Sequence, residues 1–292
     1  INKYYGVLSG KLGPDDNPTN YANNARSRGV NIGGSGGGSS AILRGVCIQD
    51  CQQSGIECTA PVAIDKCVFR RIRVNGGNFG GNCIRIFGTG YVSLTNTFVD
   101  NEAEDGIWAS SGTGPVAGYM SKVWIRKNYL APLLPSANHM DGIQLGTGPD
   151  NWKLDKLYVD HFLPEKLATD GLPLIGSCIL NSGTETSTKG VILTNSIFRS
   201  NNTAWNLRQP SMIWERNCFE NYSNPANVKY QGYDQELCVI GNGAGHTIKS
   251  NFFFIGPGVQ CSSTGVAIGL NGAVYAGSVW ENNTMVSNGR QR

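Results

Sequence analysis

Three Asp-Gly dipeptides, each followed by an aliphatic residue, are the part of this sequence that could carry out chemistry. Their aspartates are Asp105, Asp141 and Asp170. If strands that begin at these residues stack on one another, neighbouring carboxyl groups lie about 5 Å apart and alternate ones about 10 Å apart. Like charges at that spacing raise each other's pKa, so one carboxyl group can stay protonated near neutral pH. Glycoside hydrolysis requires such a pair, at about 5 Å for a retaining route and about 6.5–9.5 Å for an inverting one.

The Asp141 copy is the richest, because His139 lies two residues before the aspartate. On an extended strand His139 and Asp141 share a face, so the imidazole can position the carboxylate or move a proton. Two other interpretations stay open. Asp-Gly is a common turn dipeptide, since Asp bonds the local backbone and Gly accepts a positive φ. A carboxylate cluster could also hold Ca²⁺, but it would need several more oxygens; no clear motif supports the ion, and no cofactor is expected.

Each Asp-Gly opens a segment in which a small residue is followed by alternating apolar residues, and similar segments recur along the chain. Alternation predicts strands whose Ile, Leu and Cys side chains point inward. The segments are Gly55–Cys58, Cys83–Ile86, Gly106–Ala109, Gly142–Leu145, Trp205–Leu207, Leu237–Ile240 and Val266–Ile268. The outer face is predicted to consist of Glu57, Arg85, Trp108, Gln144, Asn206 and Ala267.

Long insertions at 129–141, 146–154, 161–172 and 222–236 are expected to form loops, and the first three cluster around the Asp copies. They bring aromatic rings, Tyr158 among them, near Trp108, where the rings either stack on sugars or cover the ends of the core. The candidate substrate-binding residues are Trp108, Gln144, Tyr129, Trp152, Arg85 and Arg208. The candidate catalytic residues are Asp105, Asp141, His139 and Asp170, with Asp105 and Asp141 as the acid and base or nucleophile pair.

A second recurring position, usually asparagine, follows an apolar strand and precedes an aromatic or aliphatic residue. Asn bonds its own local backbone and tolerates the left-handed region, and stacked amides can bond one another. Repetition at intervals of 22 to 35 residues predicts a solenoid of stacked parallel strands rather than a β-sandwich. The position is occupied by Cys67, Asn96, Asn128, Asp160, Asn195, Asn217, Asn251 and Asn283. The copy at Asp160-His161 is the irregular one, and the Asp-Gly copies lie on and beside it.

These two columns resemble the right-handed parallel β-helix superfamily of pectate lyases, polygalacturonases and phage tailspikes, over about residues 41–292. The expected fold is an all-β, right-handed parallel β-helix (solenoid) of about eight or nine coils, with residues 1–40 as a short N-terminal cap or entry segment. Around Asp141 the chain is similar to the Asn-Thr-Asp-Gly motif of polygalacturonases. His246 and Lys249 are similar to parts of two later motifs. The consecutive Asp-Asp pair of that family is absent after residue 141.

The amino-acid composition favours some classes of protein and argues against others. Charged residues are 15% of the chain and Gly contributes 39 of 292 residues, which is typical of a turn-rich all-β protein. A net charge of +3 does not indicate nucleic acid, which requires a concentrated basic stripe. No apolar run approaches the length of a membrane span. Nine cysteines cannot all pair, which indicates free thiols and folding in a reducing cytosol. The spacing from Cys47 to Cys51 does not suit zinc, so no metal site is predicted.

The leading hypothesis is an enzyme that binds a polysaccharide along its side and cleaves it, as a glycoside hydrolase rather than a polysaccharide lyase. A lyase would need cations such as Lys122, Arg126 or Lys127 to neutralise a uronate. Free thiols and the lack of an initiator Met favour a fragment of a phage tailspike or depolymerase. That group implies a homotrimer at a virion surface or outside the cell. The alternative hypothesis is a non-catalytic receptor-binding or structural β-helix, in which the Asp column only makes turns.

Overall fold

The computed structural model describes residues 6–9, 29–33, 40–49, 51, 54–72, 82–87, 90–101, 105–110, 116–127, 141–145, 151–162, 176–181, 190–201, 203–207, 211–222, 238–240, 245–257, 268–270 and 277–287. Within these ranges the chain forms 28 strands and no helix, so the all-β prediction is confirmed for this part of the protein. The strands pair in parallel and build three sheets, which we call A, B and C.

Sheet A consists of ten strands: β1 (Gly6–Ser9), β4 (Val46–Gln49), β7 (Val68–Arg70), β10 (Phe98–Asn101), β13 (Trp124–Lys127), β16 (Tyr158–His161), β19 (Ile197–Ser200), β22 (Cys218–Asn221), β25 (Phe252–Ile255) and β28 (Thr284–Ser287). Sheet B consists of nine: β2 (Val30–Ile32), β5 (Ser54–Cys58), β8 (Asn82–Phe87), β11 (Asp105–Ser110), β14 (Ile143–Leu145), β17 (Ser177–Asn181), β20 (Thr203–Leu207), β23 (Cys238–Ile240) and β26 (Ile268–Leu270). Sheet C consists of nine: β3 (Ala41–Arg44), β6 (Val62–Asp65), β9 (Gly90–Thr95), β12 (Val116–Ser121), β15 (Lys153–Asp155), β18 (Ile192–Thr194), β21 (Ile213–Glu215), β24 (Thr247–Lys249) and β27 (Val279–Glu281).

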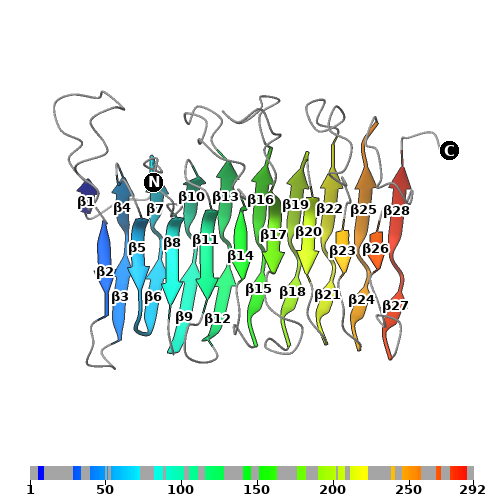
Figure 1. The fold of residues 1–292 in the computed structure, drawn as a ribbon, viewed down its shortest axis with the longest axis horizontal. Helices are drawn as coiled ribbons and strands as arrows, with labels where there is room; N and C mark the ends of the chain where they lie inside the picture. Colours follow the sequence, from blue (N-terminus) through cyan, green and yellow to red (C-terminus); the bar gives the residue numbers. More distant parts are fainter. Residues whose placement is uncertain are drawn as a thin grey trace, which may run out of the picture.

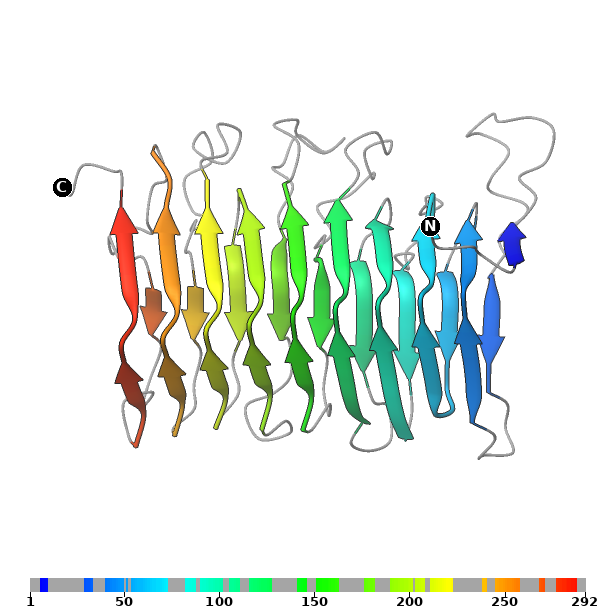
Figure 2. The same cartoon turned by 180° about the vertical axis from the view of Figure 1, so that it is seen from behind.

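The chain visits the three sheets in rotation, so each sheet receives every third strand. From β3 in sheet C it passes to β4 in sheet A and β5 in sheet B, and then returns to sheet C with β6. The colours in Figures 1 and 2 run in sequence order along the long axis, from β1 at one end to β28 at the other. This is the stacked parallel architecture that the two repeated columns predicted. The hand of the coil and the superfamily stay predictions.

Two strands lie inside the segment 1–40 that was predicted to be a cap. β1 pairs in register with β4, and β2 pairs in register with β5. These strands therefore continue sheets A and B by one rung, so part of the entry segment belongs to the stack itself.

The core is built from columns in which one position repeats from rung to rung. Phe198, Phe219 and Phe253 occupy one such column and are at most 1% exposed. Their rings stack with centroids 5.4 and 5.2 Å apart. In-register parallel pairing produces this column, because equivalent side chains on successive strands point to the same side. The side chains that the sequence predicted to point inward thus form the columns of the core.

Trp152 belongs to this core and not to the outer surface. It was predicted to offer its ring to a sugar, but its side chain is 0% exposed. A Cβ atom added at Gly118 would lie 2.6 Å from the indole, so only glycine leaves room for this ring. Trp152 was assigned to a loop because it lies in one of the long insertions. In the structure it directly precedes β15 and points inward.

A two-residue turn joins each strand of sheet C to the next strand of sheet A from β6 onward. The first turn residue has a positive φ, which bends the chain at the same place in every coil. These residues are Lys66 (55°), Asn96 (49°), Lys122 (55°), Lys156 (56°), Asn195 (51°), Arg216 (57°), Ser250 (56°) and Asn282 (54°). The second turn residue points inward. The buried ones are Cys67, Thr97, Val123, Leu157, Ser196, Asn217 and Asn251.

An asparagine ladder forms at the second turn position of the last three coils. Asn217 Nδ2 donates to Asn251 Oδ1 at 3.0 Å, and Asn251 Nδ2 donates to Asn283 Oδ1 at 3.0 Å. The same oxygens accept from the backbone N–H groups of Asn217 and Asn251. One rung earlier, the Ser196 N–H donates to Asn217 Oδ1. The ladder satisfies buried backbone donors that the turn leaves without a strand partner.

Two other asparagines of the predicted column do not belong to this ladder. Asn96 and Asn195 hold the exposed first turn position, one residue before the ladder. Asp160 lies inside β16, so it does not replace a ladder amide; the ladder position of that coil is Leu157. Asn128 lies outside the described residues. A slip of one to three residues is easily made from sequence, because Asn suits both turn positions.

The cysteines act as small core residues. Cys47, Cys51, Cys58, Cys67, Cys83, Cys178 and Cys218 are free thiols, and all but Cys218 are buried. Burial, with a smaller effect of Glu57, raises the pKa of the Cys58 thiol to about 12. This thiol stays protonated at neutral pH, as expected for a cysteine that packs rather than reacts.

Candidate functional site: two faces of the solenoid

Asp105 and Asp141 lie on neighbouring rungs of sheet B, as the sequence predicted, but they do not face solvent. Asp105 begins β11 and is 3% exposed; Asp141 lies just before β14 and is 0% exposed. The Asp141 N–H donates to Asp105 Oδ1 at 3.0 Å, and the Gly106 N–H donates to the Asp141 carbonyl oxygen. The Asp105 carboxylate therefore bonds the backbone of the next rung, which is a structural role.

Gly142 is required by the same packing. A Cβ atom there would lie 2.6 Å from the Cys178 carbonyl oxygen and 2.8 Å from the Val159 side chain. The glycine of this Asp-Gly pair thus permits close approach of two rungs. Ser54 and Asn82 hold the position equivalent to Asp105 on the two preceding rungs and are also buried. The start of sheet B is consequently a column of buried polar side chains.

The remaining predicted residues of sheet B form a cluster on its outer face. Arg85, Trp108 and Gln144 are aligned on successive rungs, and each is partly exposed. The Arg85 guanidinium lies 4.9 Å from the centre of the Trp108 ring and 4.2 Å from that of Phe87. Predicted residues that lie outside the described part of the chain are Asp170, His139, Tyr129 and Arg208.

Sheet A carries a column of aromatic side chains that the sequence reasoning did not single out. Phe98, Trp124 and Tyr158 are aligned on β10, β13 and β16. The rings meet edge to face, with centroids 5.0 Å apart for Phe98 and Trp124 and 5.8 Å for Trp124 and Tyr158. Trp124 is 47% exposed, and the apolar column continues through Ile197 to Phe252. Tyr158 was expected near Trp108, but its ring contacts Trp124.

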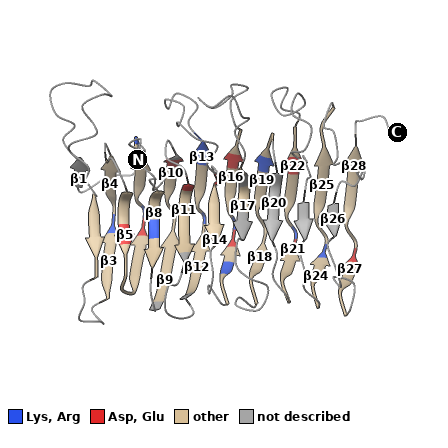
Figure 3. Ribbon diagram, viewed as in Figure 1, with Lys and Arg blue, Asp and Glu red and all other residues tan. Residues whose placement is uncertain are grey.

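A column of alternating charges runs beside the aromatic column, two residues further along each strand. Figure 3 shows the alternation as blue and red segments on β13, β16, β19 and β22. Arg126 Nη2 and Asp100 Oδ2 are 3.1 Å apart, and a second bond joins Arg126 Nε to the other carboxylate oxygen. The column consists of Gln49, Arg70, Asp100, Arg126, Asp160, Arg199 and Glu220.

Arg199 is the centre of this charged column. Its Nε donates to Glu220 Oε2 at 3.0 Å, and its Nη1 lies 3.6 Å from Asp160 Oδ1. Nη1 also donates to the Tyr158 hydroxyl at 3.1 Å, which links the charged and aromatic columns. The Tyr222 hydroxyl donates to Glu220 Oε2 at 2.7 Å. Arg199 thus has a partner on both neighbouring rungs, and these contacts hold the face in one arrangement.

Burial raises the pKa of Asp160 above its ordinary value, although Arg199 and Arg126 oppose the rise. The Tyr158 hydroxyl and other partners raise the pKa of Arg199, so the guanidinium stays charged. Sheet A therefore presents an acid with a raised pKa next to a permanent cation.

A signal for this face exists in the sequence. An aromatic residue, an aliphatic residue and a charged residue follow one another at Phe98-Val99-Asp100, Trp124-Ile125-Arg126 and Tyr158-Val159-Asp160. The aliphatic residue points inward and its two neighbours point outward. The prediction used Phe98 only to locate the asparagine, placed Tyr158 near Trp108, and assigned the outer face from the strands of sheet B alone.

Among the described residues, no group of three or more His, Cys, Asp or Glu side chains could hold a metal ion. The same residues include no helix long and apolar enough to cross a membrane. Comparison with protein-family models, with curated proteins and with solved structures finds no match for this chain.

Proposed function

We propose that this protein binds a polysaccharide along the outer face of sheet A. The observation that carries the proposal is the aromatic column of Phe98, Trp124 and Tyr158 beside the charged column centred on Arg199. Aromatic rings provide flat apolar surfaces for sugar rings. Guanidinium, carboxylate and phenol groups donate and accept hydrogen bonds, as sugar hydroxyls require. An extended polymer that follows the solenoid axis would meet both kinds of group on successive rungs.

The regular spacing of the stack supports an extended ligand over a compact one. Parallel strands repeat about every 4.8 Å, so the face offers similar contacts at equal intervals. Edge-to-face packing and the contacts of Arg199 hold these side chains before any ligand arrives, which reduces the entropy lost on binding. A homotrimer at a virion or cell surface belongs to the same proposal, because several parallel faces would bind one polymer more tightly than one face.

Binding is tested on an array of neutral and acidic polysaccharides with the wild type, Trp124→Ala and Tyr91→Ala. Tyr91 is the matched control, since it is 57% exposed but lies on β9 of sheet C. We expect Trp124→Ala to weaken binding of any retained glycan by about tenfold or more, because aromatic anchors contribute strongly to recognition. Tyr91→Ala should bind as the wild type does. Failure of the wild type to retain any polysaccharide would contradict the proposal.

Cleavage of the bound polymer is the second candidate function, and one observation favours sheet A as its location. Asp160 and Glu220 lie two rungs apart, so their strands are about 9.6 Å apart along the stack, and an inverting hydrolase needs two carboxyl groups about 6.5–9.5 Å apart. In this route Asp160, whose pKa is raised by burial, is the acid that donates a proton to the departing glycosidic oxygen. Glu220 accepts a proton from the water that attacks the anomeric carbon. Asp105 and Asp141, both buried, are the alternative acid and base.

Cleavage is measured by release of reducing ends and, for a lyase, by absorbance of the unsaturated uronate. Asp160→Asn and Glu220→Gln should each abolish release if the pair acts on sheet A. Asp105→Asn and Asp141→Asn test the buried pair in the same assay, with folding followed by circular dichroism. A wild type that binds the polymer but releases no reducing ends and no unsaturated product would leave the non-catalytic receptor-binding alternative.

A further inference from the structure

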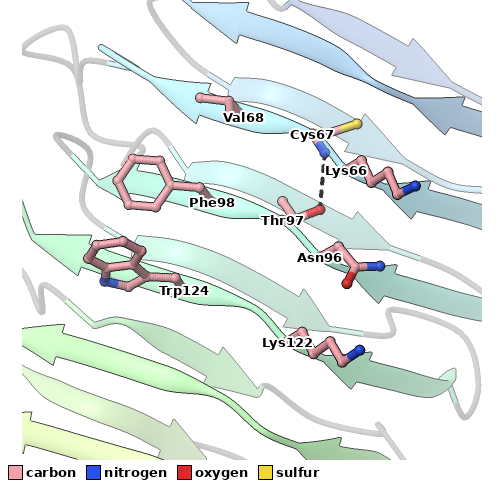
Figure 4. A pocket seen from close by; sticks show the side chains of 8 residues that line it. All are labelled: Lys66, Cys67, Val68, Asn96, Thr97, Phe98, Lys122 and Trp124. Carbon is pink, nitrogen blue, oxygen red and sulfur yellow. Dashed lines mark hydrogen bonds between the residues drawn. The ribbon is translucent and has the colours of Figure 1, made fainter. Parts of the chain in front are cut away.

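A shallow hollow lies at the corner where sheet C turns into sheet A. Its volume is about 240 Å³, and it spans the rungs of β7, β10 and β13. Figure 4 shows the labelled side chains, with the lysines at the turn and the aromatic rings on the neighbouring strands. The hollow is lined by Lys66, Cys67, Val68, Asn96, Thr97, Phe98, Lys122 and Trp124.

The lysines of this hollow occupy costly backbone positions. Lys66 and Lys122 both have φ of 55°, in the left-handed region. That conformation costs an ordinary L-residue about 1–2 kcal/mol and suits Gly or Asn better. Gly45 and Asn96 hold the same turn position on neighbouring rungs, so cheaper residues fit there. Lys156, Arg216 and Ser250 also hold this position with a positive φ, so the turn accepts several residue types, and lysine is one that brings a charge to the corner.

The hollow is basic on one side and apolar on the other. Among the described residues, no carboxylate lines it. The nearest one in sequence, Asp65, pairs with Arg44 at 3.1 Å and accepts from the Thr95 hydroxyl and the Asn96 amide at 2.8 Å each. The hydrogen bond from Asn96 is the main reason that the pKa of Asp65 is lowered. Asp65 is thus engaged chiefly by groups other than the two lysines, whose charges remain available to a ligand.

We infer that this hollow recognises an acidic sugar, with the anionic group between Lys66 and Lys122 and the sugar ring against Trp124. The inference rests on the proposed function and names its substrate class. Lys66 and Lys122 lie two rungs apart, about 9.6 Å along the stack, so their flexible side chains can converge on one anion. Trp124 lines the hollow and belongs to the aromatic column of sheet A. A sugar bound at this corner would therefore be one unit of a polymer that lies along sheet A.

A second hollow of about 300 Å³ adjoins the first one at Lys122. It shares Asn96 and Lys122 with the first hollow and adds Lys156 on the next rung. Lys156 lies 3.7 Å from Asp155, so its charge is partly neutralised there. Specificity for the anion should consequently depend on the first hollow, whose described lining contains no carboxylate.

A nucleic acid is the other polyanion that such lysines could bind, and the corner favours the glycan. Carboxylates occupy the position just before the turn on four of the described rungs, at Asp65, Asp155, Glu215 and Glu281. These carboxylates interrupt the positive charge along the corner. Nucleic-acid sites instead show a continuous basic stripe.

The inference is tested with polygalacturonate, alginate and hyaluronate, each compared with its carboxyl-reduced, neutral form. We expect the wild type to bind at least one acidic polymer about tenfold more tightly than its reduced form, since charge-assisted hydrogen bonds to two lysines are lost. The double variant Lys66→Gln, Lys122→Gln should lose this preference and still bind the reduced polymer. Lys153→Gln is the matched control, because Lys153 is exposed on sheet C but lines neither hollow.

The outcomes separate this inference from the proposed function. Binding of neutral glycans without any preference for the acidic form would overturn the inference alone. Binding of no glycan at all would overturn both. An equal loss in Lys153→Gln would show a general charge effect and contradict the site. Tighter binding of a single-stranded oligonucleotide than of any acidic glycan, abolished in the double variant, would assign the hollow to nucleic acid.

Discussion

Two sets of carboxylates in this solenoid show how the same residue type serves different ends on different sheets. At the start of sheet B, Asp105 and Asp141 are buried, and Asp105 bonds the backbone of the next rung. On sheet A, Asp160 and Glu220 flank Arg199 on a partly exposed face. Regular spacing of carboxylates therefore does not identify an active site by itself. Exposure of the face decides whether a stacked column can meet a ligand.

The largest expected effect comes from the buried set. Asp105→Ala leaves the buried Asp141 N–H without its acceptor, which should lower the free energy of unfolding by about 2 kcal/mol. Asp160→Ala, on the open face, should cost less than about 1 kcal/mol. Urea denaturation of both variants checks the difference. Equal losses would mean that the two sets do not differ as we describe.

Arg199→Ala should have an intermediate effect on stability and a strong one on binding. The change leaves Asp160 and Glu220 without their shared cation and removes the contact with Tyr158. We expect a loss of about 1 kcal/mol, because the pairs are partly exposed. Glycan affinity should fall more than in the Arg216→Ala control, whose ion pair with Glu215 lies at the end of sheet C and lines neither hollow. Urea denaturation measures the stability, and titration calorimetry measures the affinity. An unchanged affinity would show that Arg199 does not belong to the binding face.

The pH dependence of stability distinguishes Asp160 from an ordinary surface carboxylate. Its pKa is raised in the folded state, mainly by burial, so ionisation is harder there than in the unfolded chain. The resulting penalty is absent below the unfolded pKa of about 3.9 and is complete above the folded pKa. Asp160→Asn should therefore gain stability relative to the wild type as the pH rises through that range. A constant difference between pH values of about 3 and about 7 would contradict the raised pKa.

Trp124→Ala should have the smallest effect on stability. The side chain is 47% exposed and its ring contacts are edge to face, so we expect a change of about 0.5 kcal/mol. The same variant is expected to lose glycan binding. Thermal unfolding alongside the glycan array would check this separation of stability from function. A large loss of stability would instead indicate that the aromatic column holds the solenoid together.

Much of the fold could be predicted from the pattern of residues along the chain. The ladder of Asn217, Asn251 and Asn283 was predicted at the correct residues, since apolar residues recur in register around each asparagine. The placement of Asp105 and Asp141 on neighbouring rungs was also correct. The candidate site was harder to predict. Trp152 was assigned to a surface loop, because nothing in its local sequence reveals the space left by Gly118.

By itself, the sequence determined that strands repeat and which side chains alternate inward, because these properties depend on neighbours along the chain. The tertiary structure alone decided which of the outward columns is open, which carboxylates are buried and which rings meet. Those outcomes depend on the register between strands that lie far apart in the chain, as for Trp124 and Tyr158. A shift of one residue in that register would turn every outward side chain of the strand inward.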